Sequence, residues 1–568
     1  MIAVNVMLAA AVVALGAPHP LKVFDETPER MSVNSFGRTL HDFESDGFGW
    51  LEIDAAATGT CFLVYGEKLN PDDTVDRFTP QNVRVAAARW DIVRTGWQRV
   101  PFAPDVRNSM PAAEGAPIDI SPRFGTVAPF RAVETVHAPF PLVRGSYRRR
   151  RVAYPFDMSE SSFSCDDARL VKVWGFCKYS IWSTSFTGYM VDGDRERIPY
   201  EADAYSTQLA AYGVSSDYAY ARRTIEYLYD HPTWPTEFKQ ASIMSAWADW
   251  MYTGDLSSAA RHYETLKTKK ILSAAARPSD GLLVTGGERL PGSLTNALGY
   301  ADIVDWPTTE RDGFVFRPVN AVVNAFYHRN LNEMADLAAA LGKASDAKTF
   351  RDEAARVRRA FAAVFVDAAS GLCADGEGTD HASVHANAAA LACGVLPESL
   401  RGKVSEWLAK RGMACSVYFS NYLLEALFDN GQEEAAFRLL TADDNRSWLG
   451  MLAQGATMTT ESWNAAVKPN EDWNHSWAAV PAGVIARLVC GVRPLEPGFS
   501  KISIRPHFGR LRRLSASVPT AKGVVRMDLD GDALTVDVPA PAVFVFGPQK
   551  VELSRGTHNI NLNRRNTK

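Results

Sequence analysis

The sequence predicts a multidomain α and β protein in which an (α/α)6 barrel of six helical hairpins lies between an N-terminal β-sandwich and a small C-terminal β-sandwich. Three observations predict this fold class. The chain has 568 residues, which at roughly 150 residues per domain corresponds to three or four domains. Short apolar or alternating runs occupy both ends, whereas segments with helical periodicity fill the middle. The links between these helical segments alternate between short and long, as six hairpins in a ring require.

The N-terminal residues 1–17 resemble a secretory signal peptide. An apolar run from Ile2 to Leu15 is followed by two small residues. This run is shorter than the ~18 residues that suggest a spanning helix, and no other stretch is long and apolar enough for one. We therefore predict a periplasmic or secreted bacterial protein with no membrane span in the mature chain. The alternative is an uncleaved or misassigned start.

Residues 24–160 are predicted to form the N-terminal β-sandwich. Short apolar or alternating runs at 48–53, 61–65 and 83–85 lie between clusters of Gly, Pro, Asn and Asp, which is typical of antiparallel strands. The four consecutive arginines at 148–151 are predicted to form a solvated linker to the barrel rather than an anion site.

Residues 161–490 are predicted to form the barrel. Periodicity and helix-start residues indicate twelve helices, at approximately 165–182, 202–213, 215–229, 238–253, 255–273, 318–342, 344–367, 383–394, 397–411, 417–429, 431–441 and 476–490. An irregular bundle or solenoid is the alternative, although the sequence has no fixed repeat period.

Residues 491–568 return to a β pattern and are predicted to form the C-terminal β-sandwich. An alternating run at 501–505 is followed by further strand-like runs at 523–529, 533–538 and 542–546, with turn residues between them.

Composition excludes several function classes. Hydrophobic residues make up 46% of the chain and charged residues 22%, as in packed globular proteins rather than disordered or collagen-like chains. The net charge of -4 does not provide the broad positive field of a nucleic-acid-binding protein. We therefore predict no nucleic-acid partner. The sequence makes no prediction about oligomeric state.

Motifs for metals and cofactors are absent from the sequence. The seven cysteines are far apart and form no Cys-x-x-Cys pair. His381 and His385 are four residues apart near the start of a predicted helix, but no third ligand lies nearby in the sequence. The chain has no P-loop and no Gly-x-Gly-x-x-Gly or Gly-x-Ser-x-Gly motif. We predict no cofactor and no metal.

Two polar clusters stand out, one before the second helix and one before the twelfth. Residues 192–203 contain five carboxylates and two arginines, cut by Pro199, and residues 459–477 combine Glu461 and His475 with three tryptophans. The alternatives are an exposed charged loop and a Trp-rich packing layer. In a closed ring of parallel inner helices the second and twelfth helices are neighbours, so both loops open at one mouth.

Two carboxylates facing each other in an aromatic cleft are what glycoside hydrolysis requires. One carboxyl must be protonated to give a proton to the leaving oxygen, and the other must be ionised to activate water or to attack. Tryptophan faces stack on the apolar face of a pyranose. The sequence therefore indicates a carbohydrate substrate.

Several ordered motifs resemble the bacterial α-L-rhamnosidases of glycoside hydrolase family 78. The segment Asp-Gly-Asp-Arg-Glu-Arg-Ile-Pro-Tyr-Glu-Ala-Asp at 192–203 is similar to the motif at the start of their six-hairpin domain, with an Asp seven residues after the Glu. Further similar segments are His-Pro-Thr-Trp-Pro-Thr-Glu at 231–237, Ile-Val-Asp-Trp-Pro at 303–307, Thr-Glu-Ser-Trp at 460–463, Trp-Asn-His at 473–475 and 497–506. The resemblance covers about residues 165–510.

The resemblance implies an inverting glycosidase that removes terminal α-L-rhamnosyl residues from a rhamnose-containing glycan or glycoside. Glu196 would be the general acid and Glu461 the general base, with their carboxyls about 6.5–9.5 Å apart to leave room for a water. The residues implied to line the sugar pocket are Asp192, Arg195, Asp203, Trp234, Glu237, Asp305, Trp306, Trp463 and His475.

Two other functions are compatible with the sequence. One is a different six-hairpin exo-glycosidase or a lyase acting on a uronate-containing glycan, where a lyase would need a Tyr or His base and a cation that neutralises the uronate. The other is a non-catalytic carbohydrate-binding protein, against which the presence of both Glu196 and Glu461 argues.

Overall fold

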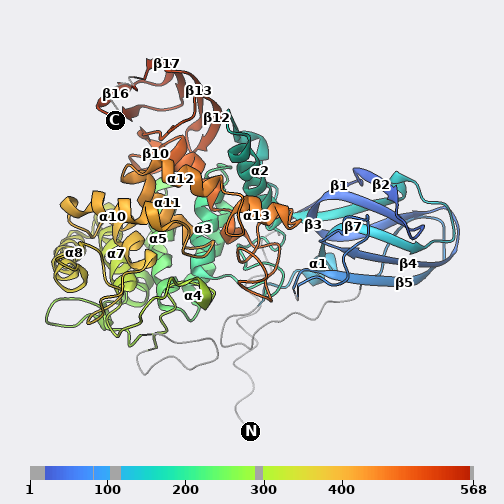
Figure 1. Ribbon diagram of the computed structural model, residues 1–568, viewed down its shortest axis with the longest axis horizontal. Coiled ribbons are helices and arrows are strands. Elements are labelled where there is room, and N and C mark those ends of the chain that lie inside the picture. Colours follow the sequence, from blue (N-terminus) through green and yellow to red (C-terminus); the bar gives the residue numbers. More distant parts are fainter. Residues whose placement is uncertain (1–19, 81, 103–116, 288–298, 563, 565–568) are drawn as a thin grey trace, which may run out of the picture.

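The computed structural model describes residues 20–80, 82–102, 117–287, 299–562 and 564 (Figure 1). The predicted signal peptide of residues 1–17 lies outside these ranges. Among the helices within them, none combines the length and apolar character needed to cross a bilayer. A central helical domain lies between an N-terminal sheet domain and C-terminal sheets (Figure 1), so the predicted fold class is confirmed.

The N-terminal domain is an antiparallel sheet in the order β1-β8-β3-β7-β4-β5, with β2 and β6 also paired to β3. A short helix, α1 (Ser121–Phe124), precedes β7. The N-terminal domain has a core of its own made of aromatic and aliphatic side chains, while Phe48 of β3 and Val152 of β8 belong to the core of the helical domain. The strands are β1 (Lys22–Glu26), β2 (Arg30–Val33), β3 (Thr39–Ala55), β4 (Gly59–Gly66), β5 (Val85–Ile92), β6 (Gly96–Arg99), β7 (Ala128–His137) and β8 (Tyr147–Ala153).

The four consecutive arginines lie within β8, so the prediction of a solvated linker is wrong. Arg149 and Arg151 are each 1% exposed, and both donate to the carboxylate of Glu26 on β1 at 2.6 Å. Arg151 also donates to the hydroxyl of Ser183, the last residue of the helix α2 (Ala168–Ser183), at 2.7 Å. Alternation along a strand sends every second side chain inward, and the one carboxylate of Glu26, shared by both guanidinium groups, offsets part of their buried charge.

The helical domain is a closed ring of six inner helices, each of which packs against the next, with α14 packing against α3. The inner helices are α3 (Glu201–Tyr212), α5 (Thr236–Thr253), α7 (Ala321–Ala340), α9 (Val384–Ala392), α11 (Ser420–Asp429) and α14 (Val480–Val484). The outer helices are α2 (Ala168–Ser183), α4 (Ala219–Asp230), α6 (Ser257–Thr265), α8 (Ala344–Phe365), α10 (Glu398–Arg411) and α12 (Glu433–Leu440).

All twelve predicted segments contain one of these helices. The twelfth segment is divided into a 3-10 turn, α14 and a π-helical turn (Ile485–Val489). A further short helix, α13 (Trp448–Ala453), was not predicted, because six residues are too few to show a helical period.

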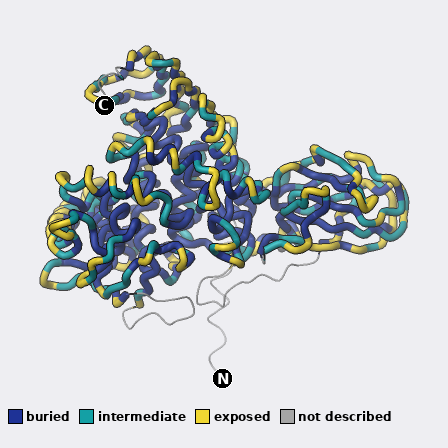
Figure 2. The backbone as a smooth tube through the Cα atoms, viewed as in Figure 1, coloured by how far each residue is buried: buried dark blue, intermediate teal, exposed yellow. Residues whose placement is uncertain are grey.

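The C-terminal region has two sheets, in the orders β10-β11-β15-β16 and β17-β14-β13-β12-β9. Their strands are β9 (Ser162–Cys165), β10 (Val492–Pro494), β11 (Ile502–Ile504), β12 (Arg513–Thr520), β13 (Gly523–Asp530), β14 (Ala533–Val538), β15 (Ala542–Phe546), β16 (Gln549–Leu553) and β17 (Gly556–Asn561). β9 precedes α2 in the chain yet pairs with β12, so residues assigned to the barrel by sequence belong to this sheet. The C-terminal sheets share one continuous core with the helices (Figure 2).

Candidate active site

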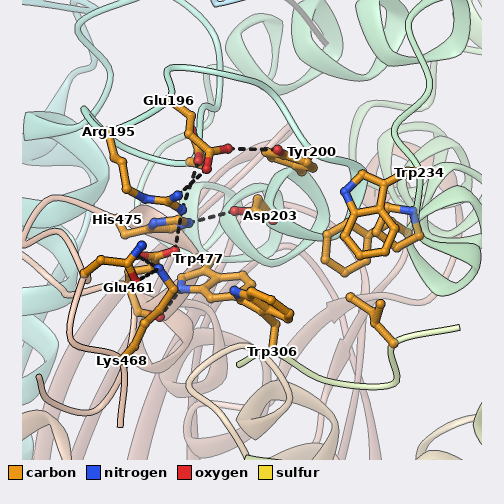
Figure 3. A pocket seen from close by; sticks show the side chains of 15 residues that line it. Arg195, Glu196, Tyr200, Asp203, Trp234, Trp306, Glu461, Lys468, His475 and Trp477 are labelled. Atoms are coloured by element: carbon orange, nitrogen blue, oxygen red, sulfur yellow. Dashed lines mark hydrogen bonds and ion pairs between the residues drawn. The ribbon is translucent and has the colours of Figure 1, made fainter. Parts of the chain in front are cut away.

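The ring of inner helices opens on a pocket of about 240 Å³ beside the loops that enter α3 and α14 (Figure 3). The two polar clusters identified in the sequence meet there. Its lining combines acidic, basic and aromatic side chains: Asp192, Arg195, Glu196, Tyr200, Asp203, Trp234, Pro235, Phe238, Ile303, Trp306, Glu461, Lys468, Asn470, His475 and Trp477.

Glu196 lies in the loop that enters α3. Its carboxylate accepts a hydrogen bond from the Tyr200 hydroxyl at 2.8 Å through Oε2 and one from Arg195 through Oε1 (Figure 3). The loop can approach the second loop closely because residue 193 is glycine. Gly193 has a φ of 93°, and a Cβ there would lie 2.5 Å from Oδ2 of Asp472, so a side chain would be excluded both by strain and by contact.

Glu461 lies in the second loop and is held by two cations. The Arg195 guanidinium donates to Oε1 at 2.6 Å, and the Lys468 ammonium donates to Oε2 at 2.8 Å. Burial raises the pKa of the Glu461 carboxyl, but the charges of Arg195, Lys468 and His475 outweigh burial and lower the pKa to about 2. Glu461 is therefore ionised at neutral pH.

Arg195 bridges the two glutamates. One guanidinium group donates both to Oε1 of Glu196 and to Oε1 of Glu461. Two hydrogen bonds and the width of a guanidinium group place these oxygens no more than about 8 Å apart. This limit is compatible with the separation expected of an inverting pair, about 6.5–9.5 Å.

His475 joins the two ends of the helical ring. Its Nε2 lies 2.7 Å from Oδ1 of Asp203 on α3, and its Nδ1 lies 3.4 Å from Oδ1 of Asp472. Burial lowers the pKa of the imidazole, but the hydrogen bonds and charges of the two aspartates raise it well above the usual value. His475 is therefore a cation at neutral pH.

Asp192 contributes a second acidic group to the pocket. Its Oδ1 accepts from the backbone N–H of Ile198 at 3.1 Å, while the buried Oδ2 receives no hydrogen bond from the residues that the structure describes. Burial and the neighbouring charge of Glu196 raise the pKa of Asp192 well above its ordinary value. Asp192 can thus hold a proton and offer a hydrogen bond to a ligand hydroxyl.

Glu461, Asp472 and His475 also have the spacing of metal ligands, with their ligand-type atoms within 4.8 Å of one another. Both oxygens of Glu461 already accept from Arg195 and Lys468, and His475 contacts two aspartates. A metal ion would have to displace these positive groups, so we assign the cluster to ion pairs.

Aromatic side chains form the other wall of the pocket. Trp234 lies across from the glutamates, and Trp306 is also part of the lining (Figure 3). Trp477 is anchored below Glu461, since its Nε1–H donates to the Glu461 backbone carbonyl at 3.0 Å and its ring stacks on Tyr418. The pocket therefore combines a charged side for hydroxyl groups with flat apolar faces suited to a sugar ring.

A protein-family model matches the helical domain of this chain. The model of the bacterial α-L-rhamnosidase six-hairpin glycosidase domain matches residues 158–489, more than half of the chain. The chain belongs to this family. The resemblance identified from the sequence motifs is therefore confirmed.

Among curated rhamnosidases, one from Alteromonas sp. (strain LOR) is 28% identical over 237 residues, which cover 38% of this chain and 25% of that protein. The match to a Streptomyces avermitilis rhamnosidase covers 21% of that protein. The match thus spans only about a quarter of the length of these curated relatives.

Solved rhamnosidase structures share the fold. The α-L-rhamnosidase of Dictyoglumus thermophilum superposes with a TM-score of 0.76 at 18% identity, covering 96% of this chain and 64% of that chain. The Streptomyces avermitilis enzyme in complex with L-rhamnose has a TM-score of 0.75 at 18% identity, covering 95% and 53%.

Three residues predicted to line the pocket, Glu237, Asp305 and Trp463, lie behind its wall instead. Glu237 is fully buried and accepts from the backbone N–H groups of Ile303 and Val304. Asp305 is fully buried and accepts from the N–H of Trp306 at 2.8 Å, from Ser416, and pairs with His385 at 2.7 Å.

Trp463 is also fully buried, and its Nε1–H donates to the Cys415 carbonyl at 2.8 Å. Glu237 and Asp305 accept hydrogen bonds from the segment that carries Ile303 and Trp306, so they support the pocket wall without touching the cavity. The other predicted residues, Asp192, Arg195, Glu196, Asp203, Trp234, Trp306, Glu461 and His475, do line it.

Seven residues that line the pocket were not predicted as site residues: Tyr200, Pro235, Phe238, Ile303, Lys468, Asn470 and Trp477. Tyr200, Pro235, Ile303 and Trp477 lie within or beside the motifs quoted above, so their neighbourhood was a usable signal. Lys468 had no such signal, because only the course of the loop brings it back to Glu461.

Proposed function

We propose that this protein hydrolyses the glycosidic bond of a terminal α-L-rhamnosyl residue with inversion at the anomeric carbon. The observation that carries the proposal is the arrangement of Glu196 and Glu461, which share Arg195 in a pocket with an aromatic wall. Membership of the rhamnosidase family supports the reaction class. The Streptomyces avermitilis relative has the same fold and was solved in complex with L-rhamnose, which supports L-rhamnose as the sugar that is removed.

Glu461 suits the role of general base. Its carboxylate stays ionised because Arg195 and Lys468 neutralise it from both oxygens. In the proposed reaction a water between the carboxyls attacks the anomeric carbon, and Glu461 takes one proton from that water. The anomeric C–O bond breaks and the leaving oxygen takes the electron pair.

Glu196 suits the role of general acid. Arg195 occupies its Oε1, and Tyr200 lies 2.8 Å from Oε2. In the proposed protonated acid, Tyr200 turns its hydroxyl hydrogen away, so that Oε2–H donates to the Tyr200 oxygen; Glu196 then passes this proton to the leaving oxygen. The products are free L-rhamnose and the shortened glycan, and one water is consumed.

Binding of the sugar is attributed to the rest of the lining. The polar groups of Asp192, Asp203 and His475 offer both donors and acceptors to ring hydroxyls. Trp306 and Trp477 offer flat faces to the apolar side of the ring. The cations that a uronate lyase would need are engaged, since Arg195 and Lys468 both pair with Glu461, so hydrolysis is favoured over elimination.

Rates of two variants on two substrates test the proposal. Glu196→Gln should lose most activity on an alkyl α-L-rhamnoside and much less on an activated nitrophenyl α-L-rhamnoside, which needs little protonation. Glu461→Gln should be slow on both, because water activation is needed whatever departs. Proton NMR of the first product should show the inverted anomer.

Glu398→Gln on the exposed face of α10 is the matched control and should behave as the wild type. Full activity of Glu196→Gln with an unsaturated product would indicate a lyase. Sugar binding without turnover by the wild-type protein would indicate a carbohydrate-binding protein.

We also propose export to the periplasm or medium, on the apolar run of residues 1–17. Mass spectrometry of the protein from its native host should find a mature N-terminus between about residues 17 and 22. An intact Met1 in the cytoplasmic fraction would contradict export.

A further inference from the structure

The loop that carries Glu196 has a second face, which lies against the N-terminal sheet domain. Asp194 is fully buried outside the pocket, and its carboxylate accepts from Nε of Arg84 at 2.8 Å and from Arg197 at 2.8 Å. The backbone is held as well, because the N–H of Ile118 donates to the carbonyl of Arg197 at 2.9 Å. Arg84 and Ile118 come from the N-terminal domain.

A second connection runs through Asn474, the residue before His475. Its Oδ1 accepts from the backbone N–H of Asp194 at 2.7 Å, and its Nδ2 donates to Oε1 of Glu67 at 2.9 Å. Because a backbone N–H can only donate, the orientation of the Asn474 amide is determined. Glu67 is therefore bonded directly to the loop before α14, and Asn474 connects it to the Glu196 loop.

Glu67 and Arg84 are neighbours at the end of one β-ladder. The last pair of β4 and β5 is Gly66 with Val85. Immediately beyond it, the N–H of Glu67 donates to the carbonyl of Arg84 at 3.0 Å, and the N–H of Arg84 donates to the Glu67 carboxylate. The sheet thus presents an acceptor and a cation side by side, on backbone that is fixed by strand pairing.

This contact is deeply buried. Glu67 is 1% exposed and hydrogen-bonds to the Asp46 carboxyl, which is 2% exposed. Burial and the Asp46 charge raise the pKa of Glu67 well above its ordinary value, so Glu67 can carry a proton toward Asp46 while Oε1 still accepts from Asn474. Polar groups this deeply buried are stabilised only while their partners stay in place.

We propose that the N-terminal sheet completes the active site, with Glu67 and Arg84 as positioning residues that hold the Glu196 loop against the loop before α14. This inference rests on the proposed hydrolysis. Its physical basis is the sensitivity of proton donation to geometry, since a displacement of 1 Å can reduce a rate about 100-fold. Neither residue lines the pocket, so substrate contacts remain when they are changed.

Kinetics of Arg84→Met on the two rhamnosides tests this role in the full-length protein. We expect kcat on the alkyl rhamnoside to fall about 10- to 100-fold, and kcat on the nitrophenyl rhamnoside to fall less than about fivefold, because only the first needs a well-placed acid. KM should stay within about threefold on both. Arg84→Lys, which keeps a positive charge beside Asp194, should recover part of the lost activity.

Glu67→Gln should show the same substrate dependence, because Asn474 Nδ2 and the Arg84 N–H donate to different oxygens of Glu67, and one of these two donors loses its acceptor whichever way the amide turns. Arg89→Met, an exposed arginine on β5, is the matched control and should match the wild type. A purely structural role predicts a lower melting temperature with equal losses on both substrates. Should Arg84→Met not fold, Asp194→Asn replaces it, with the same expected dependence on the leaving group.

Equal losses on both substrates, or no loss, would overturn the inference while leaving the proposed function intact. Wild-type protein with no activity on either rhamnoside would overturn both.

Discussion

Lys468 sets the basicity of Glu461, and its removal should move the acidic limb of the pH–rate profile. Glu461 has two cationic partners, Arg195 at 2.6 Å and Lys468 at 2.8 Å, and its pKa lies at about 2 instead of the ordinary 4.5. An opposite charge this close lowers a carboxyl pKa by about 1–3 units. Lys468→Met should therefore raise the pKa of Glu461 by about 1–2 units, equivalent to about 1.4–2.7 kcal/mol.

The direction of the pH shift follows from the role of the base. Glu461 must be ionised to accept a proton, so activity is lost as the pH falls through its pKa. A higher pKa moves that loss to higher pH. The variant should lose activity between about pH 3 and 4, a range in which the wild-type Glu461 remains ionised.

The assay is kcat/KM on nitrophenyl α-L-rhamnoside from pH 2.5 to 7, with circular dichroism at each pH to show that the protein stays folded. Lys468→Arg keeps the charge and should keep the wild-type profile. Superimposable acidic limbs for the wild type and Lys468→Met would refute the reasoning, as would an equal shift in Lys468→Arg.

Three further predictions concern other parts of the molecule. Gly193→Ala should reduce kcat at least about 100-fold, because its Cβ would lie 2.5 Å from Asp472 at a φ of 93°; activity at the wild-type level would contradict this. Arg151→Met should lower the free energy of unfolding in urea by about 1–3 kcal/mol, since it removes a buried guanidinium group that donates to Glu26 and Ser183, while Arg149 still pairs with Glu26; an unchanged free energy of unfolding would mean that these contacts are dispensable. Tyr200→Phe removes the hydroxyl 2.8 Å from Glu196, and kcat on an alkyl rhamnoside should fall about tenfold with the nitrophenyl rate little changed; a uniform loss on both substrates would argue against a role beside the acid.

Local sequence patterns were sufficient for much of the fold. The twelve helices were predicted because their periodicity and start residues act over three to four neighbouring positions. The C-terminal strands β13, β14 and β15 lie in apolar or alternating runs bounded by turn residues and were also predicted, while the partner of β9 was not. β9 has four residues, and its pairing with β12 depends on chain folded some 350 residues later, which no local pattern encodes.

The meeting of Glu196 and Glu461 could be predicted from the order of the helices. Both glutamates precede inner helices, and closing a ring of six hairpins makes the first and last inner helices neighbours. The direction of individual side chains could not be predicted. Asp305 precedes Trp306, yet one residue supports the pocket from behind and the other lines it, because the chain bends through residues 304–307 and has no regular period there.

The sequence by itself therefore determined the helical ring, its flanking sheets and the loops that carry Glu196 and Glu461, because these depend on periodicity and on chain order. Only the tertiary structure decided the charges around them. Lys468 lies beside Glu461 because of the course of one loop, Arg84 beside Asp194 joins two domains, and the buried arginines beside Glu26 join two paired strands. Electrostatic interactions act through space over a few ångströms and depend on burial, and neither distance nor burial is set by neighbours along the chain.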